Sequence, residues 1–127
     1  MIKLSADNIF VIKDILYKFT GGTNGIRDYN LLDMALNSCY QTFDGKQLYP
    51  TVAEKGVRLC FSLIKAHPFV DGNKRIGLLS MLTFFELNNV KTNFTDDELT
   101  CAILSLADGK INYDKLLDFV KTHIIQN

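Results

Sequence analysis

Residues 67–75 read HPFVDGNKR and lie between two strongly apolar stretches of the chain. The spacing of apolar residues predicts one long helix from about Thr51 to Ala66 and another from about Lys74 to Leu87. The second is apolar almost all round, which is typical of the central helix in a bundle. The chain must therefore turn within these nine residues, and the turn decides how these two helices meet.

Outward from this turn, helical periodicity continues over most of the chain, so the fold class expected is all-α. The sequence GGTNG at 21–25 breaks the pattern between the first two helices. Thr95 and Glu98 form a capping box for a helix that runs to about Ala107. The other residues expected at helix starts are Ser5, Asp28 and Asn112. The residues expected to face the core are Ile9, Ile12, Leu16 and Phe19 in the first helix, Leu31, Leu32, Ala35 and Leu36 in the second, and Leu116, Phe119, Val120 and Ile124 in the last.

One segment departs from the helical pattern. In YQTFDGKQLY, residues 40–49, the pair Asp44-Gly45 separates two short runs that contain Phe43 and Leu48. Asp-Gly favours a two-residue hairpin turn, because both central positions of that turn need a positive φ. Two short strands alone are only marginally stable, so a surface loop remains the alternative.

Length and composition are those of one globular domain covering residues 1–127. The chain has 47% apolar and 22% charged residues, which excludes a disordered tail or a fibrous protein. Fourteen basic and fourteen acidic residues give a formal net charge of zero. General nucleic-acid binding is therefore not expected, because such proteins usually carry a basic excess.

The cysteines indicate the redox state of the compartment in which the protein works. Cys39, Cys60 and Cys101 are odd in number and far apart, so we expect free buried thiols in a reducing cytoplasm rather than disulfides or a zinc site. The first residues, MIKLSADNIF, lack the pattern of a signal peptide. No apolar stretch is long enough for a membrane span, so no membrane partner is expected.

The turn at 67–75 also holds the densest group of reactive side chains. The start of the second helix offers unpaired N–H groups and a positive dipole end, and Gly72 lets the backbone approach a ligand closely. Lys74 and Arg75 add positive charge, which is unfavourable at a helix start unless an anion binds there. These features predict a phosphate-binding site. The alternative is a simple turn and cap, followed by a solvated first helical turn.

Two further residues of the turn complete the parts that phosphoryl transfer needs. Asp71 lies beside the anion site and is able to hold Mg²⁺, which binds one or two carboxylates together with phosphate oxygens. Histidine is the side chain most often used as a general base, so His67 is able to accept a proton from an attacking hydroxyl. A histidine that is merely packed or exposed is the alternative. His123 has no evident partner in the sequence, and Arg27-Asp28 is best explained by a salt bridge and a helix cap.

The stretch HPFVDGNKR agrees with the signature HPFx[D/E]GN[G/K]R of the Fic/Doc family at every specified position. GGTNGIRD, LLDMAL and QTFDGKQLYPT resemble the death-on-curing (Doc) branch of that family. The resemblance implies a Fido-type helical bundle with a small β-hairpin flap. It also implies that His67 is the base, that Asp71 binds Mg²⁺, and that Gly72, Asn73 and Arg75 hold the nucleotide phosphates, with Lys74 beside them. The implied flap, which clamps the target by strand addition, comprises Phe43, Asp44, Gly45, Lys46, Gln47, Leu48 and Tyr49.

The resemblance further suggests which group is transferred. Fic enzymes that transfer AMP carry glycine after GN and a second arginine three residues beyond the first, where this chain has Lys74 and Leu78. Doc-type toxins carry the lysine, and they phosphorylate a threonine of elongation factor Tu with ATP. Phosphoryl transfer is therefore expected. Pro68 and Gly72 look more Fic-like, so AMP transfer is the first alternative, and a binding module without chemistry is the second.

The sequence also bears on regulation. Fic proteins that inhibit themselves carry the pattern [S/T]xxxE[G/N]. The three glutamates, Glu54, Glu86 and Glu98, are followed by lysine, leucine and leucine, so the pattern is absent. Restraint is therefore expected from a cognate antitoxin whose tail folds on binding. We expect an exposed apolar groove, made by the helices beside residues 67–75, to receive it.

Overall fold

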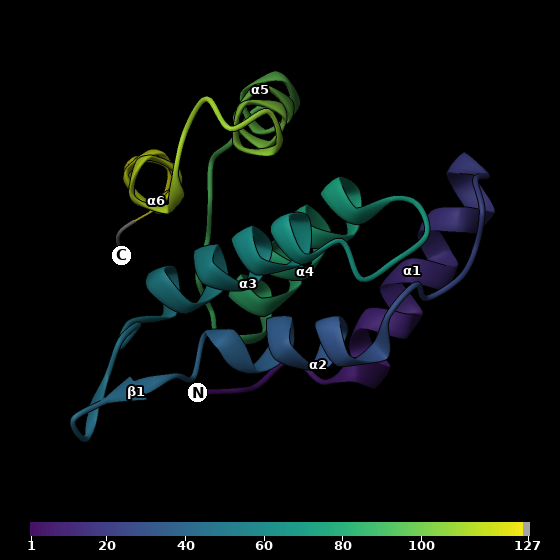
Figure 1. Cartoon of the computed structure of the whole chain (residues 1–127). Coiled ribbons are helices and arrows are strands. Elements are labelled where there is room, and N and C mark those ends of the chain that lie inside the picture. Colours follow the sequence, from purple (N-terminus) through teal and green to yellow (C-terminus); the bar gives the residue numbers. More distant parts are fainter. Residues whose placement is uncertain (126–127) are drawn as a thin grey trace.

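Helices make up most of the computed structural model, which describes residues 1–125 (Figure 1). Within these residues the chain forms six helices and one antiparallel hairpin, so the expected all-α class is confirmed. The helices are α1 (Ala6–Thr20), α2 (Tyr29–Ser38), α3 (Val52–Ala66), α4 (Asn73–Leu87), α5 (Asp96–Ala107) and α6 (Tyr113–Thr122), and the hairpin strands are β1 (Thr42–Phe43) and β2 (Lys46–Gln47).

Side-chain caps begin five of the six helices. Thr95 accepts a hydrogen bond from the N–H of Glu98, whose carboxylate accepts in return from the N–H of Thr95, so the expected capping box is confirmed. α4 is the exception, because its N-cap is Gly72, which has no side chain to offer. The capping residues of the others are Ser5, Asp28, Thr51, Thr95 and Asn112.

The hairpin prediction is confirmed. Thr42 pairs with Gln47 and Phe43 with Lys46. Asp44 and Gly45 both have positive φ, 53° and 76°, which is the backbone that a two-residue type I′ turn requires. All four strand residues are exposed, and the hairpin projects from the helices between α2 and α3 (Figure 1).

The helices form three layers around the α3–α4 pair (Figure 1). α1 and α2 lie on one side of this pair, and α5 and α6 lie on the other. The expected central helix, α4, packs against α1, α3 and α5, while α3 packs against α2, α4, α5 and α6. The centre is therefore shared by the two helices that flank residues 67–75.

Glycines allow α3 and α4 to approach closely. A Cβ at Gly56 of α3 would lie 2.3 Å from the ring of Phe85, and one at Gly77 of α4 would lie 3.2 Å from the carbonyl oxygen of Cys60. Around this contact the largest fully buried side chains gather into one core. They are Phe69, Phe84, Phe85, Ile9, Leu59, Leu63, Ile76, Met81, Leu106, Leu116, Val57 and Val120.

Three expectations about individual residues are wrong. Phe19, expected in the core, is 85% exposed, whereas Leu16, one turn earlier in α1, is buried. Cys39 and Cys60 are free and buried as expected, but Cys101 is exposed. His123 has a partner: its Nε2 lies 2.6 Å from a carboxylate oxygen of Glu98. None of the helices within residues 1–125 combines the length and the apolar character that crossing a membrane requires.

Candidate active site

The segment between α3 and α4 is held in place by a second, distant segment. Ile26 and Phe69 form an antiparallel bridge, the N–H of Arg27 donates to the carbonyl of Pro68 at 2.7 Å, and the N–H of Val70 donates to the carbonyl of Gly25 at 3.1 Å. The GGTNG break thus leads into residues 25–28, whose backbone pairs with that of residues 68–70.

Arg27 has a structural task that differs from the expected salt bridge. Its Nε donates to the carbonyl of His67 at 2.7 Å, and its Nη2 donates to the carbonyl of Ala66 at 3.0 Å. These are carbonyls that the end of α3 leaves without helical partners. The other half of the prediction is confirmed, because Asp28 caps α2. Arg27 therefore fixes the point at which the chain leaves α3, and that point is His67.

His67 itself lies in the left-handed region, with φ 55° and ψ 52°. A residue with a Cβ adopts this backbone only at some cost, and here it ends α3 and turns the imidazole toward solvent. The His67 side chain is exposed. It is also one of the residues that line the pocket described below.

Asn73 stabilises the turn from inside. Its Oδ1 accepts from the N–H of Phe69 at 3.0 Å, and its Nδ2 donates to the carbonyl of Phe69 at 3.0 Å. These two bonds fix the orientation of the amide, so that Nδ2 also faces Nδ1 of His67 at 3.3 Å. The Asn73 side chain is only 4% exposed and is fully occupied within the protein. What Asn73 offers a ligand in this arrangement is its backbone N–H.

The start of α4 has free hydrogen-bond donors. Gly72 adopts φ 81°, a conformation that glycine takes without strain, and α4 has no side-chain cap. The N–H groups of the first helical turn belong to Asn73, Lys74 and Arg75, and α4 begins its own ladder when Ile76 donates to the carbonyl of Gly72 at 2.9 Å. Within residues 1–125, neither Lys74 nor Arg75 forms an ion pair. Two exposed cations therefore stand at a positive helix end, the arrangement that an anion would stabilise.

A pocket of about 630 Å³ gathers these groups. His67, Asp71, Gly72, Asn73, Lys74 and Arg75 all line it, so every residue of the turn that the sequence singled out for chemistry is brought together. Apolar side chains from three helices line it as well: Leu16 of α1, Leu78 of α4, and Ile103 and Leu104 of α5. A pocket lined by both charged and apolar side chains suits a ligand that combines an anion with an apolar or aromatic part.

Asp71 is the candidate metal ligand. Its Oδ1 accepts from the N–H of Gly72 at 2.9 Å, which leaves Oδ2 without a donor among the described residues. Within those residues, no group of three or more His, Cys, Asp or Glu side chains is placed to hold a metal ion. A single carboxylate still fits Mg²⁺ that arrives with a phosphate, since phosphate oxygens and water supply the other ligands.

Two neighbours of Asp71 were missed by the sequence reasoning. The hydroxyl of Tyr17 donates to the Asp71 carbonyl, and burial followed by the Asp71 charge raises the pKa of this tyrosine. A Cβ at Gly22 would lie 2.8 Å from Asp71 Oδ2, so the glycine-rich break touches the candidate metal ligand. Neither residue belongs to a chemical motif. A glycine pair after an amphipathic helix was the one available signal, and it indicates a turn without showing what the turn contacts.

The hairpin lies apart from this pocket. Its residues do not line it; they precede α3, whereas His67 follows α3. A helix of 15 residues is about 22 Å long, and Figure 1 shows the hairpin and the α3–α4 turn at opposite ends of α3. The structure thus brings together the residues expected to bind phosphate, to hold Mg²⁺ and to act as the base, but it does not bring the expected flap to them.

The comparisons with known proteins agree with the sequence pattern. A family model described as the Fic/DOC family matches residues 3–85. Over 71 residues the chain is 39% identical to Toxin Doc of Mycolicibacterium smegmatis, and this alignment covers 56% of the chain and 55% of that protein. The chain thus spans about half the length of the curated relative that it matches. The residues that the family model matches include the whole 67–75 turn, whereas α5, which contributes Ile103 and Leu104 to the pocket, lies outside them.

Proposed function

Because the chain belongs to the Fic/DOC family, we propose that it is a Doc-like toxin that transfers the γ-phosphoryl group of ATP to a Ser or Thr hydroxyl of a translation protein. Elongation factor Tu is the first candidate for that protein, and the reaction would take place in the cytoplasm. The observation that carries the proposal is the pocket in which a histidine, a carboxylate, an uncapped helix start and two unpaired cations meet.

In the proposed complex the triphosphate lies at the start of α4. The N–H groups of its first turn point toward the bound phosphates, and Lys74 and Arg75 neutralise part of their charge. Asp71 would hold Mg²⁺, which supplies further neutralisation of the phosphate oxygens. The apolar side chains of Leu16, Leu78 and Leu104, which line the pocket, then contact the rest of the nucleotide.

His67 is proposed as the general base. The target hydroxyl oxygen forms a bond to the γ-phosphorus, the bond from that phosphorus to the bridging oxygen of ADP breaks, and the hydroxyl proton passes to the imidazole. Nδ2 of Asn73 lies 3.3 Å from Nδ1 of His67, so in this proposal Asn73 positions the imidazole that accepts the proton.

The choice of γ-phosphoryl over AMP rests on two side chains. Lys74 and Leu78 occupy the positions at which AMP-transferring relatives carry glycine and arginine, and both line the pocket. The lysine takes up space that a glycine would leave for an α-phosphate. ATP labelled at the γ or at the α phosphorus tests this choice directly. The proposal expects label on the target only from γ-labelled ATP, whereas label from α-labelled ATP would favour AMP transfer.

Substitution of Lys74 by glycine gives the matched test. Lys74→Gly is expected to weaken γ-phosphoryl transfer and to open the space for AMP transfer. Leu78 keeps that AMP transfer slow, because the second arginine is missing. A variant that transfers the γ-phosphoryl group as well as the wild type would show that Lys74 does not select the transferred group.

We also propose that a cognate antitoxin restrains the protein. Apolar side chains are exposed on the helices that line the pocket: Val11, Ile15 and Phe19 on α1 are 58%, 50% and 85% exposed, Leu79 on α4 is 37% exposed, and Leu104 on α5 is 46% exposed. The three α1 residues follow one another at intervals of four and so form one stripe. An amphipathic segment that folds on binding would cover such a surface. Expression of the chain alone should harm the host, and expression with the antitoxin should not; harmless expression of folded, active protein would remove the reason for the partner.

A further inference from the structure

A tyrosine of α1 reaches the turn that joins α3 to α4. The hydroxyl of Tyr17 donates to the backbone carbonyl of Asp71, and both residues line the pocket. The Tyr17 side chain is half-buried. Because 54 positions separate the two residues, this bond joins two helices that pack together, α1 and α4, and is not part of the local turn.

The bond acts on the peptide unit between Asp71 and Gly72. The carbonyl of this unit accepts from Tyr17, and its N–H donates to Oδ1 of Asp71 at 2.9 Å. The carbonyl and the N–H of a planar trans peptide point in opposite directions. A carbonyl that is held toward Tyr17 therefore keeps the N–H toward the carboxylate, and the orientation of the unit decides where Oδ1 is held.

The turn itself does not fix this orientation. Gly72 has φ 81°, and glycine adopts positive and negative φ about equally readily, so the peptide unit before it rotates at little local cost. Among residues 1–125, Tyr17 supplies the one hydrogen bond that this unit receives from outside the turn. The orientation thus depends on a side chain of α1.

Tyr17 belongs to a part of α1 that is fastened to the loop after it. Lys13, one turn earlier, is only 9% exposed; its Nζ donates to Oδ1 of Asn24 at 2.7 Å and lies 5.8 Å from the ring centre of Tyr17. The same loop reaches the Asp71 carboxylate, since a Cβ at Gly22 would lie 2.8 Å from its Oδ2. α1 and the loop that follows it therefore contact the backbone and the side chain of Asp71 together.

We propose that Tyr17 is a positioning residue that fixes the Asp71–Gly72 peptide and, through it, the carboxylate expected to hold Mg²⁺. Groups that orient a metal ligand affect metal binding although they do not touch the metal. The part of this inference that concerns Mg²⁺ rests on the proposed function, whereas the fixing of the peptide rests on the contacts of Tyr17 and Asp71 alone.

NMR spectroscopy of the whole chain without nucleotide tests whether Tyr17 fixes the peptide. Tyr17→Phe removes the hydroxyl and keeps the ring, so the variant should fold. We expect the resonance of the Asp71 carbonyl carbon to move, because it loses its hydrogen bond. The Gly72 N–H should exchange with water about threefold to tenfold faster, the change that loss of a neutral hydrogen bond typically gives. An unmoved carbonyl resonance with unchanged exchange would overturn the proposal.

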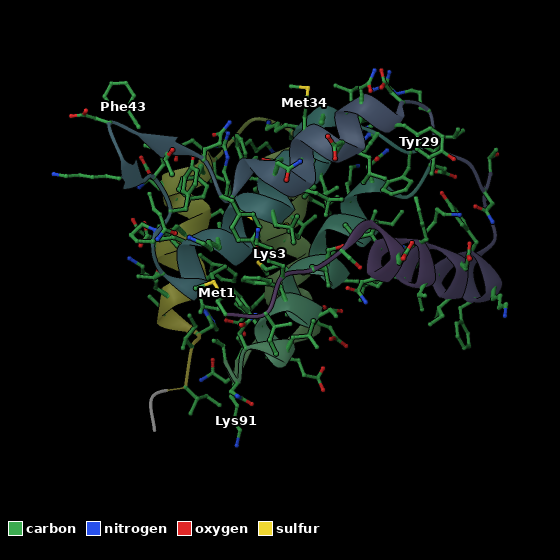
Figure 2. The ribbon with its side chains drawn as sticks, turned by 90° about the horizontal axis from the view of Figure 1, so that it is seen from below. Met1, Lys3, Tyr29, Met34, Phe43 and Lys91 are labelled. Carbon is green, nitrogen blue, oxygen red and sulfur yellow. The ribbon has the colours of Figure 1, made fainter. Side chains whose placement is uncertain are left out.

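Tyr29→Phe is the matched control. It removes the same hydroxyl from a tyrosine at the start of α2 (Figure 2), which is 68% exposed and does not line the pocket. This variant should leave the Asp71 carbonyl resonance and the exchange of the Gly72 N–H unchanged. If it alters them as much as Tyr17→Phe does, the effect does not come from the Tyr17 hydroxyl, and the proposal fails.

Calorimetry with ATP tests the part that concerns Mg²⁺. Tyr17→Phe should raise the Mg²⁺ concentration that half-saturates ATP binding about tenfold, as is typical when a group that supports a metal ligand is lost, while the affinity for ATP in EDTA changes less than about twofold. Excess Mg²⁺ should restore binding, which it would not do if Tyr17 only supported the fold. Equal losses of affinity with and without Mg²⁺ would contradict a role through the metal ligand.

The double variant Tyr17→Phe with Asp71→Asn shows whether the tyrosine acts through the aspartate. We expect it to need no more Mg²⁺ than Asp71→Asn alone, because two residues on one path have non-additive effects. Losses that add would show that Tyr17 acts independently of Asp71 and would refute the positioning role. A wild-type protein that binds no ATP would refute the proposed function, and the Asp71 carbonyl resonance would still decide whether Tyr17 fixes the peptide.

Discussion

Replacement of Asn73 by alanine distinguishes two roles for this residue. The family resemblance assigns Asn73 to the nucleotide phosphates. The structure instead shows its side chain bonded to both backbone groups of Phe69 and facing the ring of His67. If those contacts are its task, Asn73→Ala should lower the stability of the protein even when no nucleotide is present.

The expected loss follows from the groups left behind. Phe69 is 0% exposed, so its N–H and its carbonyl would lose their partners in a place that water does not reach. An unsatisfied buried polar group costs about 1–3 kcal/mol, and two such groups should cost about 3 kcal/mol together. For a domain of this size that corresponds to a fall in Tm of about 10 °C.

Thermal unfolding followed by circular dichroism, without nucleotide, measures this loss. Asn37→Ala is the matched control, because Asn37 is exposed and its Nδ2 donates within α2 to the carbonyl of Asp33; it should change stability by less than about 0.5 kcal/mol. If Asn73→Ala keeps the Tm of the wild type while its affinity for ATP falls, Asn73 is a phosphate ligand and the structural assignment is refuted.

Three further predictions concern the metal, the packing and the α5–α6 contact. Asp71→Asn should weaken ATP binding more with Mg²⁺ than without it, measured by calorimetry; equal losses would indicate that Asp71 only shapes the turn. Gly56→Ala should destabilise the protein by about 1–3 kcal/mol through overpacking, because its Cβ would lie 2.3 Å from the buried ring of Phe85; an unchanged Tm would show that α3 and α4 separate easily. The pKa of His123 is raised first by its hydrogen bond to the Phe119 carbonyl and then by Glu98. The protonated imidazole therefore stabilises the fold below about pH 6.5, and this contribution disappears as the pH rises through the pKa that His123 has in the folded protein. The pKa of Glu98 is lowered from 4.5 to about 2, first by the Thr95 N–H and then by His123. The ionised carboxylate therefore stabilises the fold above pH 4.5, and this contribution disappears as the pH falls toward 2. The difference in Tm between the wild type and His123→Gln should therefore be largest between about pH 4.5 and 6.5, and a difference that does not vary with pH would contradict this pairing.

Local signals made much of the fold predictable. Ser5, Thr95 and Asn112 act as caps through side chains a few residues from the backbone groups they bind, so the sequence contains both partners. The same holds for Asp44-Gly45, whose positive φ values follow from the turn type. The grouping of residues 67–75 was predictable for a similar reason, since nine consecutive residues cannot be far apart.

What the sequence did not reveal depends on contacts between distant segments. Arg27 reaches His67 across 40 positions, and Tyr17 reaches Asp71 across 54. The pairing of His123 with Glu98 exists only because α5 and α6 lie side by side. Phe19 has the spacing of the buried face of α1 but is exposed to solvent. The spacing of apolar residues predicts which face of a helix is buried, and not how far along the helix a neighbouring element covers that face. The distance from the hairpin to the pocket likewise follows from the straight course of α3.

The central claim is that the 67–75 turn performs phosphoryl transfer with His67 as its base. The most direct test measures transfer from γ-labelled ATP to elongation factor Tu by the wild type and by His67→Ala, with the Tm of both recorded. His67 is exposed and its side chain is not part of the core, so the variant should keep its Tm while transfer falls by roughly 10²–10⁴. Transfer at the wild-type rate by folded His67→Ala would contradict the claim.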